Sequence, residues 1–145
     1  MKVTRTTVDM PYTSSKVYEE NGKKIGYLKI EMFSNNITKQ VKKELESLKK
    51  KNIDKLVIDV RDNPGGYLTQ VTEILSLFMT KKDVIYQLQT KNNNEKVYGT
   101  SSKATYSYPV VVLINENSAS ASEILASAFK ETYNAKLVGL NSYGK

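Results

Sequence analysis

Three serines alternate with alanines in the segment NENSASASEIL (residues 115–125), at positions 118, 120 and 122. A serine becomes a nucleophile only when a neighbouring base accepts its proton. The sequence contains no histidine and no cysteine, which excludes Ser-His-Asp and Cys-His catalysis and the common zinc sites built from those ligands. The base for such a serine must therefore be a lysine, a carboxylate or a tyrosine.

The apolar residues after these serines predict a helix with one buried face. Their spacing is i, i+3, i+4, i+7 and i+8, at Ala121, Ile124, Leu125, Ala128 and Phe129. Ser120 precedes the first of them and is predicted to be the N-cap, in a capping box with Glu123. Most such serines only cap the helix. The same position also lies beside unpaired amides that could hold a developing oxyanion.

The other two serines have simpler interpretations. Ser118 is predicted to lie in the turn and Ser122 in the first helical turn, where both residue types are common. Ser120 is therefore the best nucleophile candidate of the three.

A lysine that acts as a base near neutral pH needs a pKa about 3 below its usual value of about 10.4. Desolvation or neighbouring positive charge can lower it that far. The lysines of ITKQVKKELESLKKKN (37–52) lie on a predicted exposed helix face and are poor candidates. Lys145, which follows the strand-like AKLVGL and a turn at 141–144, is better placed.

A second turn, RDNPGG (61–66), follows the apolar segment KLVIDV (55–60). Gly65 and Gly66 lack a Cβ, so the backbone there can turn sharply and bring an N–H close to a ligand. They are either a tight turn or a second oxyanion donor. We interpret Asp59, Arg61 and Asp62 as a local ion pair or turn cap.

Strands and helices are predicted to alternate along the chain. Predicted strands cover 3–10, 25–33, 55–60, 110–115 and 135–140, a hairpin is formed by 84–90 and 95–100 around residues 91–94, and helices cover 37–52, 68–78 and 121–129. This alternation favours an α/β fold with a partly parallel sheet, in which ligand sites lie beyond the carboxyl ends of the strands.

Length and charge limit the function further. The 145 residues fit one domain, and the net charge of +7 is attributed to the lysines of 37–52. No aromatic residue interleaves with those lysines to stack on a base, so we predict a solvated helix face and no nucleic-acid partner. No segment has the roughly 20 apolar residues that cross a bilayer, and residues 1–20 lack a signal peptide.

Three blocks, LVIDVRDNPGG, VVVLINENSASASEIL and LVGLNSYGK, resemble in order and spacing the carboxyl-terminal processing peptidases, or tail-specific proteases, over about residues 25–145. The resemblance implies a serine endopeptidase with a Ser-Lys dyad, in which Ser120 is the nucleophile and Lys145 the general base. It also implies an oxyanion hole formed by the amide of Ala121 and a glycine amide, for which Gly66 is favoured over Gly65. It implies no metal and no organic cofactor.

The same resemblance implies a ClpP/crotonase-like spiral of β-β-α units, with a mixed sheet flanked by helices. It implies protein or peptide substrates with free, disordered C-terminal tails, and an extracytoplasmic place, in the cell envelope or secreted, for a full-length bacterial protein. Glu131 corresponds to an acid that sometimes supports the dyad, but we interpret it as a helix-end residue.

The chain departs from the family pattern at both ends. We find no PDZ domain or signal peptide before the core, and Lys145 is the last residue, whereas family members continue for several strands and carry a glutamine four residues after the lysine. Residues 1–145 are thus expected to be a truncated protease core with little or no activity by itself. Strand edges left exposed by such a truncation favour self-association.

Two other functions fit parts of the sequence. The segment GLNSYGK (139–145) matches the G-x-x-x-x-G-K pattern of a phosphate-binding loop, without the required Ser or Thr. It would make the chain a nucleotide binder. A non-catalytic, peptide-binding relative of the same fold would keep the strand edges but have no turnover.

Overall fold

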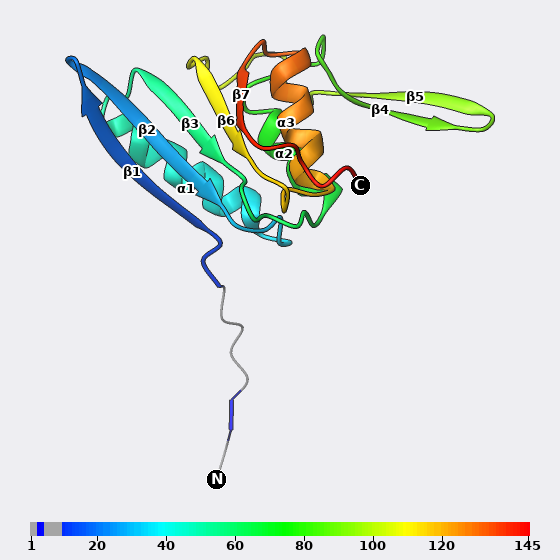
Figure 1. Cartoon of the computed structure of the whole chain (residues 1–145), viewed down its shortest axis with the longest axis horizontal. Coiled ribbons are helices and arrows are strands. Elements are labelled where there is room, and N and C mark those ends of the chain that lie inside the picture. The colour runs from blue at the N-terminus through cyan, green and yellow to red at the C-terminus, as the bar shows by residue number, and fades with distance from the viewer. Residues whose placement is uncertain (1–2, 5–9) are drawn as a thin grey trace.

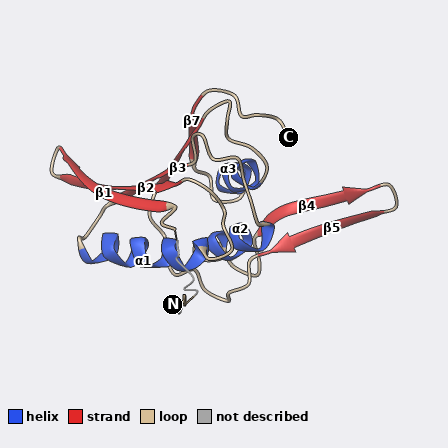
Figure 2. Ribbon diagram, turned by 90° about the horizontal axis from the view of Figure 1, so that it is seen from below, coloured by secondary structure: helices blue, strands red, loops and turns tan. Residues whose placement is uncertain are grey.

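The structure is a computed structural model that describes residues 3–4 and 10–145 (Figure 1). Its elements, in chain order, are β1 (Thr13–Glu20), β2 (Lys23–Ile30), α1 (Ile37–Lys50), β3 (Lys55–Asp59), α2 (Leu68–Leu75), β4 (Val84–Thr90), β5 (Asn93–Tyr98), β6 (Val110–Ile114), α3 (Ala121–Glu131) and β7 (Lys136–Gly139). The predicted fold class is confirmed, since a mixed sheet is flanked by helices (Figures 1 and 2).

Five strands form the main sheet in the order β1-β2-β3-β6-β7. β1 and β2 pair antiparallel through a tight turn in which Asn21 and Gly22 both have positive φ, as the Asn-Gly pair predicts. The pairs β2-β3, β3-β6 and β6-β7 are parallel. β4 and β5 form a separate two-stranded hairpin that projects away from the rest of the chain (Figures 1 and 2).

α1 covers the part of the sheet made by β1 and β2 (Figure 2). Its apolar positions Ile37, Val41, Leu45 and Leu48 recur at helical spacing and are all fully buried. Burial of each such side chain contributes about 1.5–3 kcal/mol relative to leaving it in water. The lysines of this helix lie on the opposite, solvated face, so the predicted amphipathic helix is confirmed.

Two predicted strands need correction. Residues 5–9 of the strand expected at 3–10 lie outside the described residues, while residues 3–4 and 10 are not in a strand. The first strand of the structure is instead β1, which is too polar to stand out in the sequence because it is an edge strand with largely exposed side chains. In the hairpin, β5 begins at Asn93, so the turn is shorter than the predicted 91–94.

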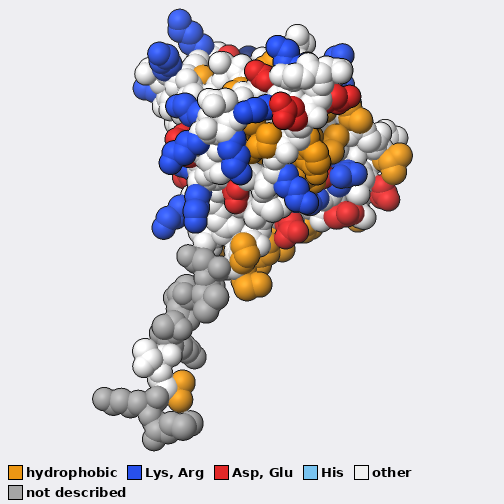
Figure 3. Space-filling model, turned by 90° about the vertical axis from the view of Figure 1, so that its left-hand side faces the viewer, with side chains coloured by type: hydrophobic (Ala, Val, Ile, Leu, Met, Phe, Trp, Pro, Cys, Tyr) orange, Lys and Arg blue, Asp and Glu red, His pale blue; other side chains and the backbone are white. Residues whose placement is uncertain are grey.

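Charged and apolar side chains share the surface on the side that faces the viewer in Figure 3. Lys and Arg side chains there lie among Asp and Glu side chains, with apolar side chains gathered between them.

Val138 of the edge strand β7 is 52% exposed, and self-association through strand edges stays a prediction. In the described ranges, no helix is both long and apolar enough to span a membrane.

Parallel pairing brings three connections to one edge of the sheet. The turns that follow β3 and β6 lead into α2 and α3, and the segment that follows β7 ends beside them (Figure 1). Phe33, just after β2, bridges to Gly66 at the same edge. The residues of RDNPGG, NENSASAS and GLNSYGK therefore become neighbours, although they are far apart in the sequence.

At this edge Asp59, at the end of β3, is 1% exposed and carries a negative charge. Its carboxylate accepts hydrogen bonds from Arg61 Nη2 at 2.8 Å and Tyr27 Oη at 2.5 Å, and Lys29 Nζ lies 3.6 Å away. Burial alone raises the pKa of Asp59, but the bonds from Arg61 and Tyr27 outweigh it and hold the pKa at about 2. The predicted Asp59–Arg61 ion pair is thus present.

Asp59→Asn is expected to lower the free energy of unfolding by about 1–2 kcal/mol at pH 7, because the folded state binds the charged form more strongly than the unfolded state does. The pKa of Asp59 is depressed in the folded state, so this stabilisation is complete above about pH 5 and disappears as the pH falls towards 2. Urea unfolding at pH 7, 4 and 2.5 measures it.

The free energies of unfolding of Asp59→Asn and the wild type should therefore converge at low pH. Glu19→Gln, which changes an exposed carboxylate, should unfold with the same free energy as the wild type at every pH. A destabilisation by Asp59→Asn that is the same at pH 7 and pH 2.5 contradicts this account of Asp59.

Candidate active site

Ser120 lies between β6 and α3 in a backbone conformation that is rare for a residue with a side chain. Its φ is 56° and its ψ is −116°, which costs on the order of 1–3 kcal/mol and persists only where surrounding contacts impose it. The Ala119 N–H donates to the Asn63 carbonyl oxygen at 3.1 Å on one side, and α3 begins on the other. A strained serine between a strand and a helix is the arrangement of a nucleophile elbow.

The turn after β3 packs directly against this serine. A Cβ on Gly65 would lie 2.8 Å from both Ser120 Cβ and the Ala119 carbonyl oxygen, and one on Gly66 would lie 2.2 Å from the Phe33 carbonyl oxygen. Both contacts are too short for any side chain. The two glycines are therefore needed for the RDNPGG turn to approach Ser120 and the end of β2.

Two amides beside Ser120 lack an acceptor among the described residues: those of Ala121 and Gly66. The Gly65 amide, in contrast, donates to Asn63 Oδ1 at 2.9 Å and cannot bind a ligand without breaking that bond. This difference favours Gly66 over Gly65 as an oxyanion donor, as expected from the sequence. The role itself stays a prediction.

Ser118 and Ser122 are fully buried and bonded to the scaffold. Ser118 Oγ donates to the Val60 carbonyl oxygen at 2.7 Å and accepts from the Asn115 amide at 3.0 Å. Ser122 Oγ donates to the Asn63 carbonyl oxygen at 2.9 Å. Both hydroxyls hold the turn in place, which agrees with the structural role predicted for them.

The hydroxyl of Ser120 is held much less firmly. Ser120 and Glu123 form the predicted capping box, but its firm half is the Ser120 N–H, which donates to Glu123 Oε2 at 2.8 Å. The Ser120 hydroxyl faces the Glu123 amide without a hydrogen bond of normal geometry, because that amide donates to the Ser120 carbonyl oxygen at 2.9 Å. Of the three serines, only Ser120 has a hydroxyl available for chemistry.

Glu123 also holds the segment that carries Lys145, a function not expected from the sequence. Its carboxylate accepts hydrogen bonds from Ser142 Oγ at 2.9 Å, from the Gly144 amide at 2.5 Å and from the Lys145 amide at 3.1 Å. Burial raises the pKa of Glu123, but these bonds and the one from Ser120 more than compensate and lower it. One carboxylate thus connects the candidate nucleophile to the candidate base.

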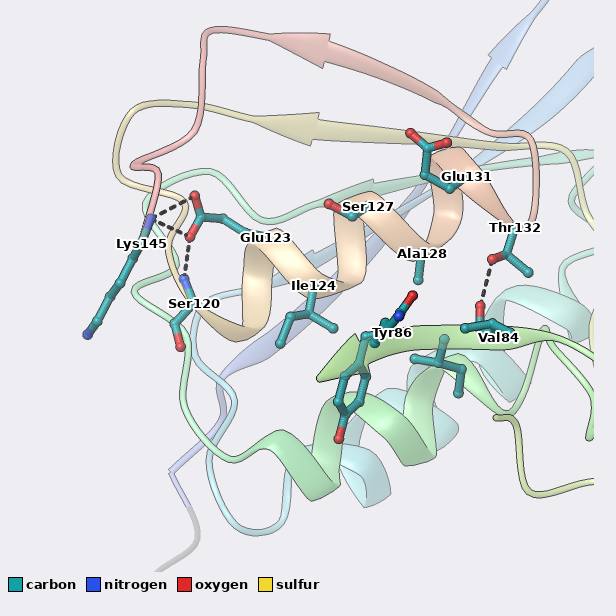
Figure 4. A pocket seen from close by; sticks show the side chains of 12 residues that line it. Val84, Tyr86, Ser120, Glu123, Ile124, Ser127, Ala128, Glu131, Thr132 and Lys145 are labelled. Carbon is teal, nitrogen blue, oxygen red and sulfur yellow. Dashed lines mark hydrogen bonds between the residues drawn. The ribbon is translucent and has the colours of Figure 1, made fainter. Parts of the chain in front are cut away.

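Lys145 is brought to the site by its backbone. Its side chain lies at the end of α3 where the helix begins, as does the Ser120 hydroxyl (Figure 4). Within the part of the chain that the structure describes, Lys145 Nζ makes no hydrogen bond or ion pair, and none joins it to Ser120 Oγ. A Ser-Lys dyad therefore requires the exposed lysine side chain to rotate onto the hydroxyl.

A groove of about 590 Å³ runs along α3 from these two residues (Figure 4). Its other wall is β4, which is tied to the helix by a hydrogen bond from Thr132 Oγ1 to the Val84 carbonyl oxygen at 2.6 Å. Apolar side chains of both elements line it: Val84, Ile85, Tyr86, Ile124 and Ala128.

Glu131 lies at the opposite end of the groove (Figure 4). Eleven helical positions separate it from Ser120, which corresponds to about 16 Å along the helix axis. The structure therefore does not bring Glu131 to the Ser120 and Lys145 pair, in agreement with its interpretation as a helix-end residue.

The segment 139–145 is poorly suited to bind a phosphate. Its amides at Gly144 and Lys145 donate to the Glu123 carboxylate, and the Tyr143 amide donates to the Ser118 carbonyl oxygen at 3.0 Å. A phosphate-binding loop needs such amides free, and a carboxylate at their centre repels an anion.

Asn63 is the site residue that sequence reasoning missed. It is 0% exposed, and its side chain bonds to the Ile30 carbonyl oxygen and the Gly65 amide, both at 2.9 Å. Its carbonyl oxygen accepts from the Ala119 amide and from Ser122 Oγ. An asparagine before Pro-Gly-Gly looks like an ordinary turn residue, and only its burial shows that it joins three segments.

The arrangement as a whole suits acyl transfer. A serine hydroxyl without a firm partner, two unpaired amides and a lysine lie at one end of an apolar groove. Residues 3–4 and 10–145 contain no group of three or more His, Cys, Asp or Glu side chains that could hold a metal ion.

Comparison with known proteins identifies similar chains. The family model described as Peptidase family S41 matches residues 24–145. The carboxyl-terminal-processing protease of Picosynechococcus sp. is 37% identical over 145 residues, which cover 100% of this chain and 35% of that protein. The carboxy-terminal processing protease CtpB of Bacillus subtilis is 40% identical over 144 residues, covering 99% and 30%.

Among solved structures, the photosystem II D1 C-terminal processing protease has a similar fold, with a TM-score of 0.82 and 24% sequence identity, over 98% of this chain and 39% of that one. The chain thus spans about a third of the length of the curated relatives it matches.

Substitution of each serine by alanine should distinguish the two hydroxyls that are hydrogen-bonded within the fold from the hydroxyl of Ser120. Ser118→Ala is expected to lower the free energy of unfolding by about 1–3 kcal/mol and Ser122→Ala by about 1 kcal/mol, because buried hydrogen bonds are lost. Ser120→Ala should change it by about 0.5 kcal/mol or less. Chemical denaturation measures all three, and a loss for Ser120→Ala as large as for Ser118→Ala contradicts the assignment.

Glu123→Gln should release the segment that carries Lys145. The amide keeps the size of the side chain but loses the charge and one acceptor oxygen, so we expect about 1–2 kcal/mol of destabilisation. Amide hydrogen exchange at Gly144 and Lys145 should become faster, while exchange in β3 changes only as the global stability does. Unchanged protection at both amides would show that Glu123 does not hold the segment.

Proposed function

This chain belongs to peptidase family S41 and to the carboxyl-terminal processing proteases within it, and from that premise we propose a Ser-Lys mechanism with Ser120 as nucleophile and Lys145 as general base. The family is one of serine-type peptidases, and the chain contains one serine at the site whose hydroxyl is not used by the scaffold. The main support for this proposal is the Ser120 hydroxyl, which lies at a strained turn beside two amides that have no acceptor among the described residues.

In the proposed reaction, neutral Lys145 Nζ takes the proton of Ser120 as Oγ attacks a peptide carbonyl carbon. The oxygen of that carbonyl becomes an oxyanion, and the amides of Ala121 and Gly66 donate to it. As the C–N bond breaks, Lys145 returns the proton to the leaving nitrogen. A water molecule then gives its proton to Lys145 and attacks the ester, which releases the acid and restores Ser120.

The environment of Lys145 decides whether this chemistry can proceed. The side chain is exposed, and it lines the β4–α3 groove together with Ser120. A peptide lying in this groove would cover both side chains. The proposal therefore links activity to occupation of the groove, and it needs no metal or organic cofactor.

Substrates of the whole protein are proposed to be proteins with free, disordered C-terminal tails, and an extracytoplasmic place is proposed for it. The names of the relatives support the substrate class, since they are carboxyl-terminal processing proteases. The groove supports binding of an unfolded segment, because Val84, Ile124 and Ala128 offer apolar surface to side chains that a folded protein would bury. A non-catalytic peptide-binding relative is the alternative, and loss of turnover with retained peptide binding distinguishes it.

Labelling with a fluorophosphonate probe, carried out on the full-length protein, tests the nucleophile. We expect Ser120→Ala to abolish labelling, and Lys145→Ala to slow it by about 10²–10⁴-fold, the usual contribution of a general base. The matched controls are Ser107→Ala and Lys130→Ala, which alter exposed residues outside the groove and should label like the wild type. Labelling that survives Ser120→Ala sinks the proposal.

A further inference from the structure

A second hollow, of about 460 Å³, shares Lys145 with the groove but does not include Ser120. It is lined by Asp62, Pro64, Asn117, Ala119, Tyr143 and Lys145. These residues come from the turns after β3 and β6 and from the segment after β7, so the hollow lies at the same edge of the sheet as the candidate active site.

The reaction proposed above, on which this inference rests, distinguishes the two cavities. The acyl half of the substrate stays attached to Ser120, so it belongs to the groove that Ser120 lines. The leaving nitrogen takes its proton from Lys145. The hollow that contains Lys145 without Ser120 is therefore the place for the residues on the leaving side of the scissile bond.

Asp62 gives this hollow a fixed negative charge. Its Oδ1 accepts from Asn115 Nδ2 at 2.9 Å and from Asn117 Nδ2 at 2.8 Å, and its own amide donates to Asn115 Oδ1 at 2.9 Å. The hydrogen bonds from Asn117 and Asn115 lower the pKa of Asp62. The carboxylate is therefore ionised at neutral pH and held in one orientation.

The other oxygen of this carboxylate is unused. In the described part of the chain, Oδ2 accepts no hydrogen bond, and Asp62 makes no ion pair with a lysine or an arginine. Asp59, three residues earlier at the end of β3, has Arg61 as its partner. Glu123, the carboxylate beside Ser120, uses both of its oxygens in hydrogen bonds, so Asp62 differs from it in having one oxygen without a partner among the described residues.

The walls of the hollow combine apolar surface with the charge of Asp62, which suits a long basic side chain. Pro64 and Ala119 offer apolar surface to the methylene groups of a lysine or arginine, whose charged head stays in contact with water. Tyr143 is 67% exposed, and a tyrosine ring also attracts a cation. An apolar residue would leave the Asp62 charge unused, and Asp62 disfavours an acidic residue next to it, although Lys145 lines the same hollow.

We propose that Asp62 is a specificity-determining residue, which selects a lysine or arginine side chain of the substrate on the leaving side of the scissile bond.

Peptides that differ only at the first or second position after the scissile bond test the proposal on the full-length protein. Lysine, glutamine and glutamate are compared at each position by kcat/KM. We expect a preference for lysine over glutamine of about 1.5- to 5-fold at low salt, the size typical of an exposed charge pair. It should shrink at high salt because the interaction is screened.

Asp62→Asn should abolish this preference and Asp62→Lys should reverse it in favour of glutamate. The ratio is taken within each enzyme, so a general effect of the charge on Lys145 cancels. Glu116→Gln is the matched control, because it removes one exposed negative charge from the adjacent loop without lining either cavity, and it should keep the wild-type ratio.

A ratio that is unchanged in Asp62→Asn overturns the inference, and so does an equal loss of kcat/KM for all peptides, which would assign Asp62 a purely structural role. Peptide binding to Ser120→Ala, measured by fluorescence anisotropy with and without Asp62→Asn, gives the same comparison without turnover. Cleavage that persists in Ser120→Ala counts against the proposed function instead, and leaves the charge preference to be judged by the binding ratio.

Discussion

The active-site edge depends on one buried side chain. Asn63 is fully inaccessible to water, and its amide joins the end of β2 to the Gly65 amide, while its carbonyl oxygen holds Ala119 and Ser122. A buried polar group is costly unless its partners are all present. The turn after β3 and the turn after β6 are therefore held together, and the strained conformation of Ser120 is maintained by bonds on either side of it.

Glu123 holds the segment after β7, the third connection at this edge, in a similar way through hydrogen bonds. Asn63 fixes the nucleophile turn from inside the fold, whereas Glu123 binds it to the segment after β7 at the surface. The Lys145 amide donates to Glu123, whereas its side chain has no hydrogen bond or ion pair among the described residues. The backbone of the candidate nucleophile is thus fixed by several hydrogen bonds, and the candidate base is fixed only through its own backbone.

Two aspartates that are three residues apart differ in their surroundings. Asp59, at the end of β3, is buried, and Arg61, Tyr27 and Lys29 surround its charge. Asp62, in the turn that follows, is exposed, and one of its oxygens is bonded to the amides of Asn115 and Asn117. The sequence predicted an ion pair or a turn cap for both: Asp59 has the ion pair, and Asp62 is bonded within the turns.

Much was determined by the sequence itself. Apolar spacing predicted α1 and α3, and the Asn-Gly pair predicted the β1-β2 turn. The helix stripe indicated Ser120 as the candidate nucleophile, the absence of histidine left a lysine, a carboxylate or a tyrosine as its base, and the family resemblance implied Lys145. These features depend on neighbours within a few positions. Burial of Asn63, the reach of Glu123 to the Lys145 segment, the free amide at Gly66 and the unpaired oxygen of Asp62 were decided only by tertiary structure. Parallel pairing of β3, β6 and β7 brings together residues up to 82 positions apart, from Asn63 to Lys145. A local sequence pattern cannot predict which amides and carboxylates are hydrogen-bonded once these distant residues meet.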